Sequence, residues 1–265
     1  MITEVSSLGS RADSKQNQYS LQKIIFIWIL SALPMGILAF VVAPKLEPII
    51  DQPPLIIYWG AVIVGLIWQF FLAVIILKKE GYPFNWSTIR DRAKYQKPIN
   101  PKTGKPSAKL FFWLIPFIIL NAYISSGIGF PDIDSLVAPI LKSFPKNDMS
   151  GLATANYKGA WWILGLYVLT FVFNYLLGEE FLYRGVLLPK MNGVFGKWDW
   201  FANGVLFGFY HLHKPHIILS TALVYGFVFA FPSKWLQSSW MGLIIHGLEG
   251  VLGLVVVLGV ILGWG

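Results

Sequence analysis

The sequence predicts an all-α protein whose helices form a bundle across a lipid bilayer. Of its 265 residues, 55% are hydrophobic and only 13% are charged, and the mean hydropathy is +0.61. A soluble domain of this size would need far more charge to cover its surface. Several uncharged stretches also reach the ~20 residues that a helix needs to cross the hydrocarbon core. These observations predict a multi-pass integral membrane protein surrounded by lipid.

The first half of the chain contains three uncharged stretches that we interpret as membrane helices. They cover residues 24–43, 55–77 and 110–130. The first of them follows a polar tail, residues 1–23, and is too long to be the core of a cleaved signal peptide. We therefore expect it to remain in the protein as the first span.

Four further apolar stretches follow in the second half of the chain. They cover residues 160–178, 200–210, 217–231 and 240–265. The total is seven membrane helices, or eight if Gly250 or Gly253 breaks the last one. Two of these stretches, 200–210 and 217–231, are too short to cross the membrane alone as straight helices. They would need to draw flanking polar residues into the protein interior, where such residues must be paired or face water.

The basic residues predict the orientation of the chain in the membrane. The formal net charge is +8, and the loop of residues 78–109 holds nine of the 21 Lys and Arg residues. Because loops rich in Lys and Arg stay on the cytoplasmic side, we expect this loop and the N-terminal tail to be cytoplasmic. The loop is rich in Pro and lacks a recognisable nucleic-acid-binding motif, so topology explains the charge and nucleic acid is not an expected partner.

Two adjacent carboxylates, Glu179 and Glu180, end the fourth apolar stretch. An ionised group at or just inside the membrane boundary is costly and usually functional. Glu180 lies four residues before Arg184, the favourable order for an ion pair on a helix. Adjacent helical residues point about 100° apart, so Glu179 does not share that arrangement and is free to face the bundle interior. We expect Glu179 to be catalytic and the other two residues to support it.

All four histidines lie in the last third of the chain: His211, His213, His216 and His246. At ~1.5 Å per residue, His211 lies roughly 16 Å and His246 roughly 9 Å from the predicted starts of their helices. Both would then reach a depth similar to that of Glu179. A neutral imidazole beside a carboxylate is a common pair for activating water. We expect His213 and His216, at a helix turn, to be packing residues.

A metal site is an alternative use of the same side chains. Zinc or iron could be bound by Glu179, His211, His246 and Glu249, and a bound metal would lower the pKa of its water. The chain has no cysteine, which excludes disulfides and cysteine-ligated zinc or iron–sulfur sites. Four histidines are also too few for the clusters of a membrane di-iron oxygenase. The sequence leaves a site without a cofactor and a site with a divalent metal both open.

Three short motifs lie in order in the second half of the chain. They are Glu179-Glu180-x-x-x-Arg184, Phe207-x-x-x-His211, and a third that begins at His246 and reaches Gly250. In this order they resemble the CPBP intramembrane proteases, also called the CAAX protease and bacteriocin-processing (Abi) family. The resemblance covers residues 160–265, which we expect to form the catalytic core. Residues 24–159, with the loop 78–109, are expected to form an N-terminal set of membrane helices.

The resemblance implies an intramembrane endopeptidase that acts on a peptide or membrane-protein substrate near the cytoplasmic face. By resemblance, Glu179 is the general base, His211 its partner, and His246 an oxyanion donor or second proton carrier. Supporting roles are expected for Glu180, Arg184, Phe207 and Glu249. Members of the family have been described both as metalloproteases and as metal-independent glutamate proteases.

Gly250 departs from the family pattern, which has Asn at this position. An Asn would supply an oxyanion donor, so we expect the substitution Gly250→Asn to raise the rate. The alternative is a catalytically weakened or non-enzymatic membrane protein, such as an immunity factor, a scaffold or a small transporter, that uses the buried charges as a proton relay or to hold helices together. An inverted-repeat transporter should have related halves, and we find no internal repeat.

Overall fold

The computed structural model describes residues 18–83, 85–125, 132–142, 152 and 157–264. Within these residues all regular elements are helices, apart from an isolated bridge between Ile99 and Pro106. The predicted all-α class is therefore confirmed. Most of the polar tail, up to residue 17, and the end of the third predicted span, residues 126–130, lie outside the described residues.

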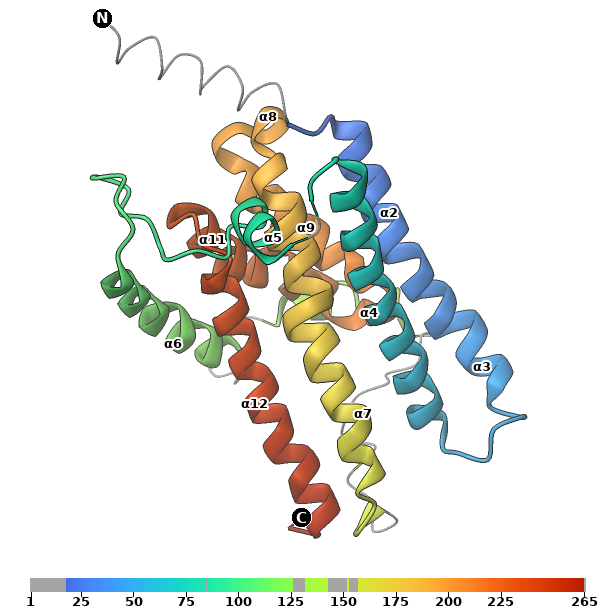
Figure 1. The fold of residues 1–265 in the computed structure, drawn as a ribbon. Coiled ribbons are helices and arrows are strands. Elements are labelled where there is room, and N and C mark those ends of the chain that lie inside the picture. Colours follow the sequence, from blue (N-terminus) through green and yellow to red (C-terminus); the bar gives the residue numbers. More distant parts are fainter. Residues whose placement is uncertain (1–17, 84, 126–131, 143–151, 153–156, 265) are drawn as a thin grey trace, which may run out of the picture.

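Four helices in the described part of the chain are long and apolar enough to cross a membrane. They cover Leu21–Leu46, Pro54–Lys79, Trp162–Lys190 and Trp240–Leu262. Figure 1 shows them side by side, labelled in chain order as α2 with α3, then α4, then α7 and its continuation, then α12. The structure thus supports a multi-pass membrane protein, with four candidate spans among the described residues, and it does not confirm the predicted count of seven or eight.

The remaining predicted spans form shorter helices. They are α6 (Leu114–Ser125), α9 (Asp199–Tyr210), and a run of helix from Ile218 that ends as α11 (Phe231–Trp235). The last helix, α12, continues unbroken through Gly250 and Gly253. An eighth helix does not arise from a break at these glycines.

The two short stretches form a hairpin that begins and ends at the same end of the bundle. Asp199, at the start of α9, and Lys234, in α11, form an ion pair. The two helices cross closely at Gly204 and Gly226. Neither residue has a side chain, and a Cβ atom on Gly204 would collide with the backbone of Gly226. Small residues allow this close approach of membrane helices. Several residues of the turn of the hairpin, 211–217, line a cavity, where irregular backbone is tolerated at membrane depth.

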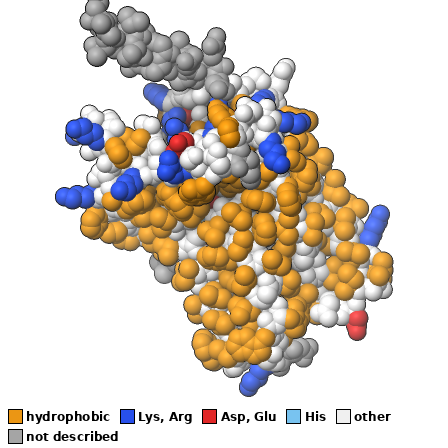
Figure 2. Space-filling model, in the orientation of Figure 1, with side chains coloured by type: hydrophobic (Ala, Val, Ile, Leu, Met, Phe, Trp, Pro, Cys, Tyr) orange, Lys and Arg blue, Asp and Glu red, His pale blue; other side chains and the backbone are white. Residues whose placement is uncertain are grey.

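Charged side chains gather at one end of the molecule. Figure 2 shows Lys and Arg side chains around the end that carries α5 (Trp86–Arg92) and α8 (Asn192–Phe195), which we call the basic end, and a largely hydrophobic surface below it. Large apolar residues are exposed on that surface, with Phe26 60%, Ile119 63% and Leu252 67% exposed. A surface of this kind is suited to contact with lipid.

A buried ion pair between Glu80 and Arg92 holds the basic end together. The Arg92 Nε donates to Glu80 Oε2 at 2.7 Å, and Nη2 donates to Oε1 at 2.8 Å. The Tyr19 hydroxyl also donates to Oε1. Arg92 reaches the third long helix too, donating to the carbonyls of Gly185 at 3.3 Å and Val186 at 3.1 Å. Burial raises the pKa of Glu80, but the hydrogen bonds and charge of Arg92 more than offset burial and lower it below its usual value.

Candidate active site

The two adjacent carboxylates lie within a long helix and not at its end. The helix Trp162–Lys190 continues for ten residues beyond Glu180. The sequence suggested a membrane boundary at Glu179 because the uncharged stretch ends there. The helix continues inside the protein because the residues that follow are buried, including Leu182 and Leu187 at 0% exposure. Both acids are therefore buried inside the protein, at 2% and 0% exposure.

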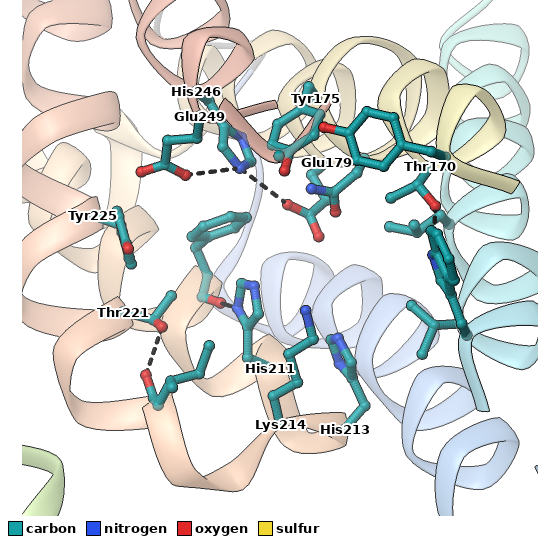
Figure 3. Close-up of a pocket in the computed structure, with 18 of the residues that line it drawn as sticks. Thr170, Tyr175, Glu179, His211, His213, Lys214, Thr221, Tyr225, His246 and Glu249 are labelled. Carbon is teal, nitrogen blue, oxygen red and sulfur yellow. Dashed lines mark hydrogen bonds and ion pairs between the residues drawn. The ribbon is translucent and has the colours of Figure 1, made fainter. Parts of the chain in front are cut away.

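A cavity of about 570 Å³ brings the predicted residues together (Figure 3). Glu179 comes from the third long helix, His211 from the hairpin turn, and His246 and Glu249 from α12. Phe207 also lines the cavity. Glu179 and the two histidines thus line one cavity.

One carboxylate oxygen of Glu179 accepts a hydrogen bond from a described residue, and the other does not. The Tyr210 hydroxyl donates to Oε1 at 3.0 Å. Oε2 is buried and accepts no hydrogen bond from the described residues, and His246 Nε2 lies 3.9 Å from it. A buried carboxylate oxygen without a partner is costly and calls for an explanation. Here the oxygen lies at a cavity wall, where a water molecule or substrate could reach it.

His246 lies among three carboxylates. Its Nδ1 is 3.1 Å from Glu180 Oε1, and its Nε2 is 3.9 Å from the Oε2 atoms of both Glu179 and Glu249. The ring stacks on Phe229 with centroids 4.7 Å apart. If Nδ1 donates to the carboxylate, the neutral ring has only an acceptor at Nε2. His246 can then donate a hydrogen bond into the cavity only as imidazolium.

His211 is oriented by the backbone. Its Nδ1 is 2.8 Å from the Phe207 carbonyl oxygen, which can only accept, so Nδ1 carries the proton and the neutral ring keeps a lone pair on Nε2. Figure 3 shows the ring pointing into the cavity, toward the side where Glu179 lies. The two side chains share the cavity but form no hydrogen bond with each other in the described structure. The neighbouring His213 is buried, stacks on the His211 ring with centroids 5.5 Å apart, and also lines the cavity.

The Glu180–Arg184 ion pair expected from the sequence is present. Arg184 Nη1 is 3.3 Å from Glu180 Oε1, and both side chains are at most 1% exposed. The guanidinium also lies over the Phe207 ring, 4.0 Å from its centroid. The same Glu180 oxygen faces His246, so the pair fixes one end of that imidazole. Neither residue lines the cavity.

Four residues of the site were not identified from the sequence. Tyr210 holds Glu179, Asn121 on α6 donates to Glu249 Oε1 at 2.7 Å, and Tyr175 and Lys214 line the cavity. Tyr210 precedes His211 in the second motif, and that position could have drawn attention to it. Asn121 lies in an apolar stretch far from the motifs, and nothing in the local sequence relates it to Glu249.

The structure overturns the expectation for Gly250. A Cβ atom there would lie 2.6 Å from Cδ2 and Cε2 of Tyr175 and 2.8 Å from Cδ2 of Phe171. Contacts this short require the aromatic rings to move. An Asn at this position has no space, so we no longer expect Gly250→Asn to accelerate a reaction.

The proposed metal ligands do not form a metal-binding group as placed. Within the described residues no set of three or more His, Cys, Asp or Glu side chains is positioned to hold a metal ion.

Residues 160–252 match the family model described as Type II CAAX prenyl endopeptidase Rce1-like. This segment is similar to the Rce1-like CAAX protease family. The match confirms the resemblance drawn from the three motifs, and the Rce1-like segment contains Glu179, Glu180, Arg184, Phe207, His211, His246 and Glu249. No curated protein and no solved structure matches the chain. The apolar helices support an integral membrane protein, and the match supports an intramembrane endopeptidase in general.

Proposed function

We propose that this protein cleaves a peptide bond with water activated by Glu179. The observation that supports this most is the unpartnered Oε2 of Glu179 at the wall of a cavity that also holds His211 and His246. The Oε2 of Glu180 is also without a hydrogen bond in the described structure, but only Glu179 of the two lines the cavity, where water or substrate could reach it. Tyr210 fixes the side chain through Oε1 and leaves Oε2 for a water molecule.

The reaction would proceed in two steps. In the first, Glu179 takes a proton from water, the new C–O bond forms at the substrate carbonyl carbon, and the carbonyl oxygen becomes an oxyanion. In the second, the C–N bond breaks and Glu179 returns the proton to the leaving amine nitrogen. The Nε2 lone pair of His211 would orient the attacking water, and His246 as imidazolium would stabilise the oxyanion.

The site would act nearer the cytoplasmic face, as the basic loop predicts. Glu179 lies 11 residues from Lys190 at the basic end and 17 from Trp162 at the other end. At ~1.5 Å per residue these distances are roughly 16 and 26 Å. The substrate would then enter from the side of the bundle that carries loop 78–109. Accessibility of single cysteines placed at Lys102 and Lys45 to an impermeant reagent tests this orientation.

The test of the function is cleavage of a peptide library by the purified protein in detergent, read by mass spectrometry. The library should include C-terminal peptides with and without a prenyl group, since the matching family model carries that activity in its name. Glu179→Gln is the blank. Cleavage by wild type alone supports the proposal, and cleavage that survives a strong chelator favours the metal-independent form. Equal product from wild type and blank, or none from either folded protein, favours a non-catalytic role such as a scaffold or transporter.

A further inference from the structure

A tetrahedral oxyanion in this cavity needs a donor besides His246. The Nδ1 of His246 faces Glu180, and its Nε2 faces two carboxylates that compete for any proton it carries. Removal of one oxyanion donor typically lowers kcat by ~10²–10³, so a second donor is expected in an active site of this type.

Most hydroxyl groups that line the cavity already donate to backbone carbonyls. These bonds run from Tyr58 to His213, from Tyr167 to Gly250, from Thr170 to Leu166 and from Thr221 to Ile217. The Tyr210 hydroxyl donates to Glu179. None of these protons is available to a substrate without breaking an existing bond.

Tyr175 is differently placed. The side chain lines the cavity, and no hydrogen bond donated by its hydroxyl is found among the described residues, which leaves its proton for the cavity. The ring meets His246 edge-on with centroids 4.8 Å apart. Figure 3 shows the side chain beside Glu179 and His246, on the cavity side of its helix.

Gly250 is what allows Tyr175 to take this position. Any side chain at residue 250 would occupy the space of the Tyr175 ring, because a Cβ atom there would lie 2.6 Å from two ring carbons. The Tyr175 ring therefore fills the space that a side chain at Gly250 on α12 would need.

We propose that the Tyr175 hydroxyl donates the hydrogen bond that stabilises the oxyanion, beside Glu179 and His246. The proposal rests on the proposed hydrolysis and adds a catalytic residue to it. When the water oxygen bonds to the substrate carbonyl carbon, the carbonyl oxygen gains negative charge and accepts the Tyr175 hydrogen bond. The tyrosine keeps its proton, and the charge returns to the C=O bond when the C–N bond breaks.

The test is Tyr175→Phe, which keeps the ring over Gly250 and removes only the hydroxyl. We expect kcat to fall by ~10²–10³ with little change in KM and in thermal unfolding. Tyr95→Phe is the matched control, since Tyr95 is a buried phenol that stacks on Phe181 of the same helix but lies outside the cavity. It should keep wild-type kcat.

A reciprocal exchange sharpens the test. Gly250→Asn alone should lower kcat, because it displaces Tyr175. Tyr175→Ala should also lower it, and the double variant Tyr175→Ala/Gly250→Asn should recover part of the rate, because the freed space admits an amide donor. Wild-type kcat in Tyr175→Phe, or a change in KM alone, overturns the inference. If Glu179→Gln is inactive in the same assay while Tyr175→Phe is fully active, only this inference fails and the proposed hydrolysis stands.

Discussion

Two buried glutamates in this protein have opposite surroundings. Glu80, at the basic end, accepts hydrogen bonds on both carboxylate oxygens, from Arg92 and Tyr19. Glu179, at the cavity, has one oxygen bonded by Tyr210 and the other without a partner in the described structure. Burial of a carboxylate is tolerated where its charge is paired and its oxygens are bonded. The difference indicates that Glu80 stabilises the fold, whereas Glu179 carries an energetic cost that chemistry in the cavity would explain.

The largest expected effect separates the roles of these two residues. Glu179→Gln should lower the cleavage rate by ~10²–10⁴, because the general base is lost, while the amide oxygen can still accept the Tyr210 hydrogen bond. Initial rates and thermal unfolding are measured on the same detergent samples.

Glu80→Gln is the matched control for that prediction. It should lower the unfolding temperature, since Arg92 loses its partner, and leave the rate per folded molecule unchanged. A Glu80→Gln protein with normal stability and no activity would break the proposed division between the two glutamates.

The second prediction concerns Arg184, which lies next to the cavity but does not line it. Arg184→Ala leaves Glu180 buried without its guanidinium and should destabilise the protein by ~3–5 kcal/mol. Activity should fall in parallel with the folded fraction, as measured by unfolding in detergent. An Arg184→Ala variant that is as stable as wild type yet inactive would instead place Arg184 in contact with substrate.

The third prediction is a pH dependence of stability from the basic end. The pKa of Glu80 is lower in the folded protein than in the unfolded chain, where it is about 4.5. The ionised pair therefore contributes stability that is fully present above the unfolded pKa and is lost as the pH falls through the lower folded value. Thermal unfolding below about pH 4.5 should show this loss in wild type and a smaller one in Glu80→Gln. An equal pH dependence in both proteins would argue against the pair.

The smallest effect is expected from Asn121. Asn121→Ala removes the hydrogen bond to Glu249 and should cost ~1.5–3 kcal/mol of stability, the usual range for bonds to charged groups. Asn121→Asp should be worse, because it places a second carboxylate beside Glu249. If both variants behave as wild type in unfolding and in cleavage, α6 does not contribute to the site.

Local patterns in the sequence predicted much of the site. The i,i+4 spacing predicted the Glu180–Arg184 pair, and the 100° step between neighbouring residues predicted that Glu179 faces elsewhere. Residue counts along the helices predicted that His211 and His246 lie at a depth similar to that of Glu179. These features depend on helical geometry, which is a property of the local chain.

Features that depend on packing between distant segments were not predictable. We predicted residues 200–210 and 217–231 as separate spans, but the close contact of Gly204 and Gly226 joins them in one hairpin. No sequence feature near Gly250 indicates that the space beside it is filled, because the ring that fills it comes from another helix. The basic loop indicated orientation but not that Arg92 bonds to the helix that carries Glu179.

The most direct test of the account is single-turnover cleavage in water enriched in ¹⁸O. If Glu179 activates water, wild type should place one ¹⁸O atom in each new C-terminal carboxyl group, and Glu179 should remain unlabelled. Glu179→Gln, folded to the same unfolding temperature, should give no product above background. Label found in the Glu179 carboxyl group, or labelled product from Glu179→Gln at the wild-type rate, would contradict the central claim that this buried carboxylate acts as a general base.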